Sequence, residues 1–213
     1  MASSRRRRVG YFGGTFNPIH YGHLRLAEEV ADFAGLDEVM FVPSGTPPHR
    51  SKPQVSAVQR LEMVRLAVAG NPRFTVNTIE VDSSPQECNY TYDTLVRLSQ
   101  MCPELSLSLI CGSDIQHQKW YRFDDIVAMI EGLYVVFRPG DDAASMEDCM
   151  RSRLHGSEEL LAKYHWVPTW GNPISSTKVR EIVAEGQSVR YLVPPAVAAY
   201  IADQGLYAVG DGE

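Results

Sequence analysis

The feature that most constrains the fold of this chain is an alternation of short apolar runs with longer stretches of helical periodicity. Short runs rich in β-branched and aromatic residues predict strands. Apolar residues at helical spacing, such as Leu26, Val30 and Phe33, predict amphipathic helices. The predicted strands are residues 9–12, 38–42, 74–81, 105–111, 133–137 and 165–169, and the predicted helices are residues 22–34, 57–69, 91–101, 123–131, 177–185 and 195–204. Because strands that alternate with helices form a parallel sheet covered on both faces, the sequence predicts an α/β, Rossmann-like, doubly wound fold.

The predicted elements fit a single domain. A chain of 213 residues is long enough for one domain with a substantial core. We expect this domain to cover residues 9–208, with a small C-terminal helical segment over about residues 171–208. Residues 139–157 are polar and weakly patterned, which predicts a loop or a surface helix. Residues 1–8 end in four arginines and are expected to form a basic, flexible tail, although such a run can also bind nucleic acid or a membrane surface.

Composition limits the classes of partner. The net charge of -6 at pH 7 argues against a nucleic-acid-binding surface, so a phosphate ligand would need a local cluster of positive groups. No apolar run approaches the ~18 residues of a transmembrane helix, so we expect no membrane partner. The four cysteines form no C-x-x-C pair and the N-terminus has no apolar secretory segment. We therefore expect reduced thiols in a cytoplasmic protein.

The strongest motif is residues 13–23, with the sequence GGTFNPIHYGH, where the first predicted strand gives way to the first predicted helix. Gly13 and Gly14 let backbone N–H groups approach an anion, and the helix N-terminus adds a partial positive charge. His20 and His23 are spaced so that both rings can face one phosphate. A tight turn with two surface histidines is one alternative. A zinc pair is another, but the spacing is not H-E-x-x-H and no third ligand is near in sequence. The motif therefore predicts a phosphate site.

Other polar residues follow predicted strands or begin a predicted helix. Residues 174–180 (ISSTKVR) place hydroxyl groups where Ser and Thr commonly cap a helix, and the same N-terminus can bind an anion. Arg180 lies one turn inside, where it can reach a phosphate or remain a solvated helix charge. Asp114 follows a strand and a glycine, where a carboxylate can accept ribose hydroxyls. Arg138 ends the strand at 133–137, at the ligand-binding edge of such a sheet, with a structural salt bridge as its alternative.

Two further pairs can be read in two ways. His49 and Arg50 follow two prolines, which stiffen a loop and lower the entropy cost of ordering it over a ligand. The alternative for this pair is an exposed polar turn. Trp120 and Tyr121 are either core aromatics or residues that stack on an aromatic ligand. The residues alone do not decide between these readings.

Residues 13–23 closely resemble the [GS]-G-T-F-x-P-x-H-x-G-H signature of the nucleotidyltransferase superfamily, and the chain is most similar to the bacterial nicotinate-nucleotide adenylyltransferase family. Each further motif is weak alone, but the ordered set is specific. The further matching segments are residues 43–50 (PSGTPPHR), 90–95 (YTYDTL), 112–114 (GSD) with 120–121 (WY), 138–140 (RPG), 174–180 (ISSTKVR), 191–194 (YLVP), 200–201 (YI) and 205–207 (GLY). Asn17 departs from the pattern, because many relatives have Asp there; the amide keeps the capacity for hydrogen bonding and removes the charge.

The resemblance implies an adenylyltransferase that transfers AMP from ATP to nicotinate mononucleotide, giving deamido-NAD and pyrophosphate in NAD biosynthesis. It implies that His20 and His23 are catalytic and that Mg²⁺ is delivered with ATP. The residues implied in ATP binding are Gly13, Gly14, Thr15, Phe16, His20, His23, Gly112, Asp114, Ser176, Thr177 and Arg180. The residues implied in binding the second nucleotide are Ser44, His49, Arg50, Thr91, Tyr92, Asp114, Trp120, Tyr121 and Arg138.

Several alternatives remain open at this point. Phosphopantetheine adenylyltransferase shares the first motif and the hydroxyl-rich helix start, but the P-P-H-R loop, the Y-T-x-x-T-L segment and the length of the chain argue against it. Nicotinamide mononucleotide is a rival substrate. A non-catalytic nucleotide-binding regulator is a rival of another class, which the presence of both His20 and His23 disfavours. The sequence is compatible with a homo-oligomer and does not specify the number of subunits.

Overall fold

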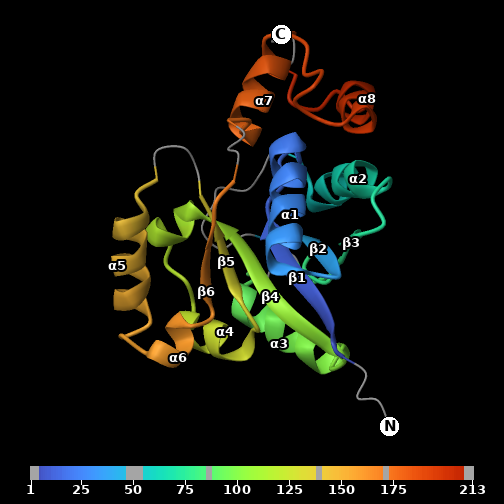
Figure 1. Ribbon diagram of the computed structural model, residues 1–213. Coiled ribbons are helices and arrows are strands. Elements are labelled where there is room, and N and C mark those ends of the chain that lie inside the picture. The colour runs from blue at the N-terminus through green and yellow to red at the C-terminus, as the bar shows by residue number, and fades with distance from the viewer. Residues whose placement is uncertain (1–4, 47–54, 85–87, 138–140, 170–172, 209–213) are drawn as a thin grey trace. The chain divides into compact units, whose positions relative to one another are not determined.

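The protein, seen here as a computed structural model, is described for residues 5–46, 55–84, 88–137, 141–169 and 173–208. Its strands and helices alternate along the chain, as Figure 1 shows. The strands are β1 (Arg7–Gly14), β2 (Glu38–Pro43), β3 (Phe74–Val76), β4 (Leu105–Gly112), β5 (Leu133–Val136) and β6 (Tyr164–Val167). The helices are α1 (Tyr21–Ala34), α2 (Ala57–Val68), α3 (Thr91–Met101), α4 (Phe123–Met129), α5 (Ala143–Arg153), α6 (Glu158–Leu161), α7 (Ser176–Ala184) and α8 (Pro195–Asp203), with a 3₁₀ helix η1 (Ser113–His117).

The strands form one six-stranded sheet in the order β3-β2-β1-β4-β5-β6. The pairs β1–β4, β4–β5 and β5–β6 are parallel. Non-consecutive neighbours in a parallel sheet require crossover connections, and helices supply them here. The predicted α/β fold with a parallel sheet is therefore confirmed.

The chain divides into two compact units, each of which is discontinuous in sequence. Unit 1 comprises Met1–Gly13, Leu26–Met40 and Tyr90–Gly171, and unit 2 comprises Gly14–Arg25, Phe41–Asn89 and Asn172–Glu213. The prediction of a single domain over residues 9–208 stays a prediction.

The core of unit 1 lies on the strands β1, β4 and β5. Val9 on β1, Leu109 on β4 and Leu133 on β5 are buried, and Leu95 of α3 and Ile126 of α4 are buried with them. These positions belong to the apolar runs and helical stripes that predict the elements. Burial of such side chains contributes roughly 1.5–3 kcal/mol each to folding.

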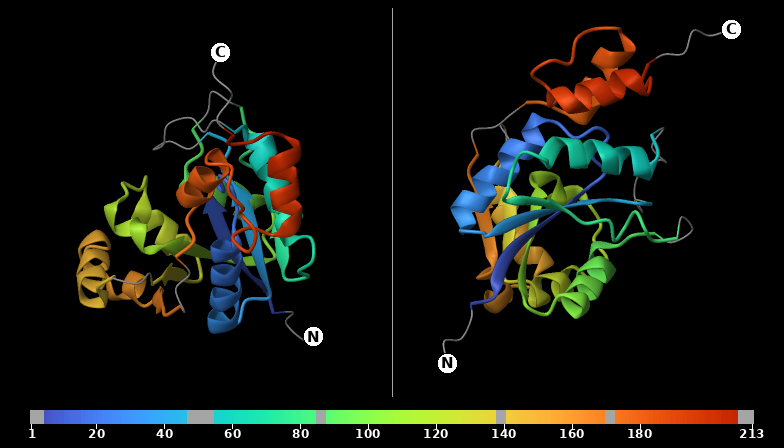
Figure 2. Two further views of the ribbon diagram at one scale, coloured as in Figure 1. Left: turned by 90° about the horizontal axis from the view of Figure 1, so that it is seen from above. Right: turned by 90° about the vertical axis from the view of Figure 1, so that its right-hand side faces the viewer.

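Unit 2 has its own apolar core, to which the C-terminal helices contribute. Helix α2 packs against β3 and α8, and Figure 2 shows α2 and α8 side by side. Phe41 of β2, Met63 of α2 and Val197 of α8 are fully buried. The C-terminal helical segment therefore belongs to the core of this unit.

The third predicted strand, residues 74–81, is shorter than expected because polar side chains turn the backbone after Val76. The side chain of Asn77 accepts a hydrogen bond from the N–H of Ile79 at 2.9 Å. The N–H of Asp82 donates to the carbonyl of Thr78 at 2.8 Å, and the Thr78 hydroxyl donates to the Asp82 carboxylate. This local bonding competes with a strand ladder, so the β-forming residues beyond Asn77 form a turn.

The weakly patterned segment 139–157 contains the helix α5. Asp142 caps it by accepting hydrogen bonds from the N–H groups of Ala144 and Ser145. The sequence allowed a loop or a surface helix here, and a helix is present. The short elements α6 and η1 were not among the predicted elements, because a few residues carry too little periodicity to identify a helix.

Candidate active site

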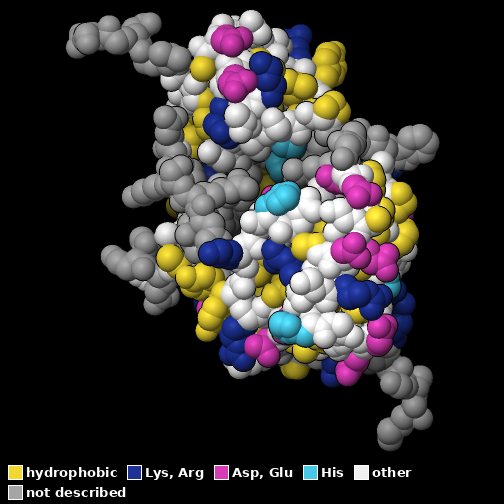
Figure 3. All heavy atoms as spheres, turned by 90° about the vertical axis from the view of Figure 1, so that its left-hand side faces the viewer, with side chains coloured by type: hydrophobic (Ala, Val, Ile, Leu, Met, Phe, Trp, Pro, Cys, Tyr) yellow, Lys and Arg dark blue, Asp and Glu magenta, His cyan; other side chains and the backbone are white. Residues whose placement is uncertain are grey.

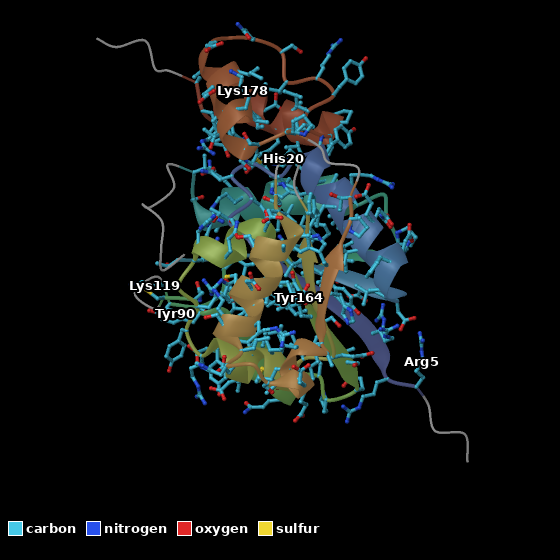
Figure 4. The ribbon with its side chains drawn as sticks, turned by 60° about the vertical axis from the view of Figure 1, so that its left-hand side comes forward. Arg5, His20, Tyr90, Lys119, Tyr164 and Lys178 are labelled. Carbon is cyan, nitrogen blue, oxygen red and sulfur yellow. The ribbon has the colours of Figure 1, made fainter. Side chains whose placement is uncertain are left out.

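The turn between β1 and α1 holds the two histidines of the sequence motif against each other. Their rings stack with centroids 3.6 Å apart and planes at 23°. The N–H of His20 donates to Nδ1 of His23 at 3.2 Å. His20 is 5% exposed and His23 is half-buried, so the alternative of two surface histidines does not describe this pair. Figure 4 labels His20.

The hydrogen bond between the two residues determines which nitrogen of the neutral His23 ring carries the proton. Because Nδ1 of His23 accepts a hydrogen bond, the proton of the neutral ring lies on Nε2. His23 can therefore offer an N–H to an anionic oxygen without first gaining a charge. Two positive rings stacked at this distance would repel each other, so protonation of one histidine disfavours protonation of the other.

The two glycines of the motif are surrounded by aromatic rings. A Cβ on Gly13 would lie 2.8 Å from the ring of Tyr11, and a Cβ on Gly14 would lie 3.0 Å from the ring of Phe16. Phe16 adopts a φ of 46°, its ring is buried, and it packs edge-on against the imidazole of His23 at 5.2 Å. The glycines therefore allow close packing of the turn as well as the approach of an anion to its backbone.

The hydroxyl-rich start of α7 contacts the same turn. Ser175 caps the helix by accepting from the N–H of Lys178 at 3.2 Å, and the Ser176 hydroxyl donates to the carbonyl of Pro18 at 2.8 Å. The guanidinium of Arg180 donates to the carbonyl of Asn17 at 2.8 Å and to the Thr177 hydroxyl at 3.2 Å. Unit 2 thus brings three residues implied in triphosphate binding, Ser176, Thr177 and Arg180, to the turn that carries the histidines.

The C-terminus adds a contact that the sequence did not predict. The hydroxyl of Tyr207 donates to Oδ1 of Asn17 at 2.7 Å. Burial raises the pKa of Tyr207, and Arg180 and Arg60 oppose that rise. The side chain of Asn17 therefore accepts a hydrogen bond within the unit.

The residues implied in binding the second nucleotide lie largely in unit 1, at the start of α3 and after η1. Thr91 is the first residue of α3, and Tyr90, labelled in Figure 4, precedes it. The ring centroid of Tyr121 lies 5.1 Å from that of Tyr90 and 6.0 Å from that of Tyr92, the latter edge-on. Tyr121 is 50% exposed. We call Tyr90, Tyr92 and Tyr121 the tyrosine cluster, and its exposed ring is available to a flat ligand.

A positive charge lies on the tyrosine cluster. The guanidinium of Arg122 sits 4.1 Å from the centroid of the Tyr92 ring and forms an ion pair with Asp125 at 2.6 Å. A guanidinium over an aromatic face is attracted by the ring quadrupole. Hydrogen bonding to Asp125 raises the pKa of Arg122. The cluster thus combines aromatic surface with a cation that stays charged.

Gly112, Asp114 and Trp120 flank the end of β4. Gly112 is the last residue of β4, and Asp114, in η1, accepts a hydrogen bond from the Gln118 side chain at 2.8 Å. Trp120 is half-buried and packs edge-on against Phe123 at 5.9 Å. Its indole N–H is buried and has no hydrogen-bond partner within the described residues. That unused donor leaves room for a ligand acceptor or a water.

Three predicted site residues, His49, Arg50 and Arg138, lie outside the described residues. Ser44 is described in unit 2, at the end of β2, and its N–H donates to the carbonyl of Gly14 at 2.9 Å. Arg60, Tyr207 and Arg153 approach the predicted site residues of their own units without having been predicted. Arg60 carried a weak signal, because it falls four positions before Val64, on the apolar stripe of its helix.

The described side chains also bear on broader partner classes. On the face drawn in Figure 3, basic and acidic side chains are interspersed over the described residues. No helix in the described part of the chain is long and apolar enough to cross a membrane. All four cysteines are free in the structure.

Comparison with known proteins gives consistent matches over nearly the whole chain. The family described as cytidylyltransferase-like matches residues 11–182. A protein of Geobacillus thermodenitrificans named probable nicotinate-nucleotide adenylyltransferase is 38% identical over 203 residues, which cover 94% of this chain and 86% of the relative. A protein of the same name from Dechloromonas aromatica is 40% identical over 215 residues, covering 93% of this chain and 97% of the relative.

Solved structures match the fold at lower sequence identity. Plasmodium falciparum nicotinic acid mononucleotide adenylyltransferase complexed with NaAD has a TM-score of 0.74 and 17% identity, covering 94% of this chain and 97% of that one. The same protein complexed with APC has a TM-score of 0.73. At this identity the comparison establishes a shared fold.

Proposed function

The chain belongs to the cytidylyltransferase-like family and, within it, to the nicotinate-nucleotide adenylyltransferases, and from that membership we propose that it transfers AMP from ATP to nicotinate mononucleotide. The products are deamido-NAD and pyrophosphate, so the enzyme serves NAD biosynthesis. The observation that carries the proposal is the turn of unit 2, where stacked histidines lie with the start of α7. The P. falciparum protein of the same fold is complexed with NaAD, the product that this reaction forms.

The proposed reaction is an in-line displacement at phosphorus. An oxygen of the 5′-phosphate of nicotinate mononucleotide bonds to the α-phosphorus of ATP. The bond from that phosphorus to the oxygen bridging the β-phosphate breaks, and pyrophosphate leaves with the electron pair. The attacking phosphate is already an anion near neutral pH, so no general base is needed. Catalysis therefore consists mainly of positioning and of stabilising charge.

We assign the ATP side of this reaction mainly to the turn after β1 and the start of α7, and Gly112 and Asp114 stay predictions for ATP binding. Backbone N–H groups from Gly13 to Phe16 would donate to the triphosphate, together with the start of α1. Nε2 of His23 would donate to the α-phosphate, and the stacked ring of His20 would share the developing charge. Ser176, Thr177 and Arg180 would hold the β- and γ-phosphates, with Arg180 exchanging its internal hydrogen bonds for stronger bonds to phosphate.

We assign the second nucleotide mainly to residues at the start of α3 and around η1. The ring would stack on Trp120 or on Tyr121 of the tyrosine cluster, and Asp114 would accept ribose hydroxyls. Backbone N–H groups near Tyr92 and Tyr121 would receive the carboxylate of the nicotinate ring. Thr91 and Ser44, with His49, Arg50 and Arg138 outside the described residues, complete the proposed contacts.

We propose that Mg²⁺ arrives with ATP. The imidazole, guanidinium and backbone N–H groups gathered at the turn suit phosphate oxygens and not a hard cation, and the Ser176 hydroxyl is engaged with the carbonyl of Pro18. Among the described residues, no group of three or more His, Cys, Asp or Glu could hold a metal ion. Phosphate oxygens and water would therefore hold the ion, which neutralises part of the triphosphate charge.

We place the reaction in the cytoplasm, where four free thiols stay reduced. The proposal calls for small nucleotides as partners, with neither nucleic acid nor membrane, and it leaves a homo-oligomer open.

The test is pyrophosphate release with ATP and Mg²⁺ and one of three second substrates: nicotinate mononucleotide, nicotinamide mononucleotide or phosphopantetheine. We expect the highest kcat/KM with nicotinate mononucleotide. Faster turnover of the amide or of phosphopantetheine would replace the proposed substrate. Tight ATP binding without pyrophosphate release on any of the three would favour a non-catalytic regulator.

A further inference from the structure

Arg60 of α2 is a buried charge that bonds to the backbone of two predicted site segments of unit 2. Its side chain is among the largest that are fully buried, with 1% of the residue exposed. Arginine is almost never buried to this degree without partners. One guanidinium nitrogen donates to the carbonyl of Thr15 at 2.6 Å, and the other donates to the carbonyls of Ser44 at 2.6 Å and Gly45 at 3.2 Å. The planar, forked guanidinium group of Arg60, called the fork below, therefore bridges the turn after β1 and the segment after β2.

The hydrogen bonds of this fork end on carbonyl oxygens. Burial lowers the pKa of Arg60, and the charges of Tyr207 and Glu80 oppose that fall. Glu80 is itself buried and acts on Arg60 through the electrostatic field. Arginine keeps its proton in proteins, so unit 2 holds a permanent positive charge under the turn that begins at Gly13.

The bridge fixes the direction of the peptide groups in the turn. In a planar trans peptide, the carbonyl and the following N–H point in opposite directions. The Thr15 carbonyl points to Arg60, so the N–H of Phe16 points away from it. The Gly14 carbonyl accepts from the N–H of Ser44 at 2.9 Å, so the N–H of Thr15 points away from Ser44. Two N–H groups proposed to bind ATP thus owe their directions to Arg60 and to the segment that it holds.

From this geometry we infer that Arg60 is a positioning residue for adenylyl transfer, which orients the backbone donors of the turn and adds a buried positive charge beneath the triphosphate. The inference rests on the proposed function, because it names a residue that serves the same reaction without touching the reacting atoms. A lysine cannot replace it fully, because a single ammonium lacks the planar fork that reaches both Thr15 and Ser44.

The test compares Arg60→Met, which removes charge and donors, with Arg60→Lys, which keeps the charge and loses the fork. Arg65→Met is the matched control, because Arg65 lies on the same helix, is exposed and pairs only weakly with Glu62 at 3.8 Å. Each variant is assayed for kcat, for KM with ATP and with nicotinate mononucleotide, for its thermal unfolding midpoint, and for amide hydrogen exchange of residues 13–17 without ligand.

We expect Arg60→Met to lower kcat about 100-fold and to raise the KM for ATP, the scale seen when a charge-stabilising donor is lost. Arg60→Lys should recover part of this, remaining about 10-fold below the wild type in kcat. In both variants the amides of residues 13–17 should exchange faster than in the wild type, and the KM for nicotinate mononucleotide should rise less than the KM for ATP, because Arg60 also holds the backbone of Ser44. Arg65→Met should match the wild type in every readout.

A purely structural role would lower the folded fraction and leave the KM of the remaining folded enzyme unchanged for both substrates. That result, or a folded Arg60→Lys variant with wild-type kcat and wild-type exchange in residues 13–17, would overturn the inference. If Arg60→Met does not fold, the comparison of Arg60→Lys with Arg65→Met decides whether Arg60 is a positioning residue. A wild type that releases no pyrophosphate would refute the proposed function, whereas hydrogen exchange would still report whether Arg60 holds the turn.

Discussion

His20 and His23 share one turn, but they differ in burial and in the hydrogen bonds that they can offer to a ligand. His20 is buried, and its backbone N–H is engaged with the ring of His23. His23 is half-buried and keeps its proton on Nε2, where it can serve as a donor. The two rings stack, so each lies in the field of any charge on the other. Loss of either ring should change the charge that the pair offers to the α-phosphate.

The contact between the two rings leads to a prediction for His20. The substitution His20→Ala should lower kcat by about 10²–10³, the usual scale for one lost charge-stabilising donor. Turnover is measured by pyrophosphate release, with the folded state checked by circular dichroism. His155→Ala is the control, because His155 is exposed and only pairs with Asp124 at 3.2 Å. A folded His20→Ala enzyme with unchanged turnover would remove His20 from the mechanism.

The second residue-scale prediction concerns the bond from Tyr207 to Asn17. The substitution Tyr207→Phe removes this part-buried hydrogen bond and should lower the free energy of unfolding by about 1 kcal/mol near neutral pH. The pKa of Tyr207 is raised above its ordinary value of 10.0. Its contribution is therefore fully present below about pH 10 and is lost as pH rises further, because the unfolded chain ionises first.

The measurement is urea unfolding of both proteins from about pH 8 to about pH 11. The stability difference between wild type and Tyr207→Phe should shrink over the alkaline part of this range. Tyr134 and Tyr164 also have raised pKa values, but they are present in both proteins and cancel in the difference. A difference that stays constant to the top of the range would show that the Tyr207 hydroxyl does not titrate as expected.

Helix α5 is joined by hydrogen bonds to η1 and to the residue that follows it. The guanidinium of Arg153, the last residue of α5, donates to the carbonyls of Gln116 at 2.9 Å and Gln118 at 2.8 Å. The side chain of Gln118 in turn donates to Asp114. Helix α5, which lies in the weakly patterned segment 139–157, therefore supports residues that we assign to the second nucleotide.

A substitution at Arg153 tests whether these hydrogen bonds support the binding of the second nucleotide. The substitution Arg153→Met should raise the KM for nicotinate mononucleotide about 10-fold, since two charged hydrogen bonds that order the segment are lost. The KM for ATP should change less. Arg151→Met is the control on the same helix, because Arg151 is exposed and pairs with Glu158 at 3.0 Å. An equal rise of both KM values would assign Arg153 to general stability.

The features of the molecule that the sequence predicted are those that depend on the pattern of side chains. The alternation of apolar runs and helical stripes identified the parallel sheet, and the segment from Gly13 to His23 identified the turn. The sequence did not predict roles for Arg60 and Tyr207. Arg60 bonds to backbone carbonyls and Tyr207 bonds to the side-chain amide of Asn17, and only folding brings these partners close. The sequence overextended β3, since β-forming residues after Asn77 are held in a turn by local polar bonds. Long-range backbone partners leave no periodic trace in a sequence.

The metal ion is expected to take part in the reaction and not in folding. If Mg²⁺ arrives with ATP, a chelator should stop pyrophosphate release and leave the thermal unfolding midpoint of the ligand-free protein within about 1 °C of its original value. The imidazole and guanidinium groups of the turn suit phosphate oxygens, so the ion is expected to follow ATP and folding should not depend on it. ATP with Mg²⁺ at about 100 times its Kd should stabilise the fold by about 2.7 kcal/mol, or roughly 5–10 °C for a chain of this size.

The control is restoration of activity by added Mg²⁺ after chelation, with ATP present throughout. Differential scanning fluorimetry reads the midpoint, and the pyrophosphate assay reads the chemistry. A fall of several degrees in the midpoint of the chelated, ligand-free protein would mean that the ion is a structural part of the molecule, and delivery with ATP would be wrong. Full activity in the presence of excess chelator would mean instead that the imidazole and guanidinium groups of the turn neutralise the triphosphate without a metal.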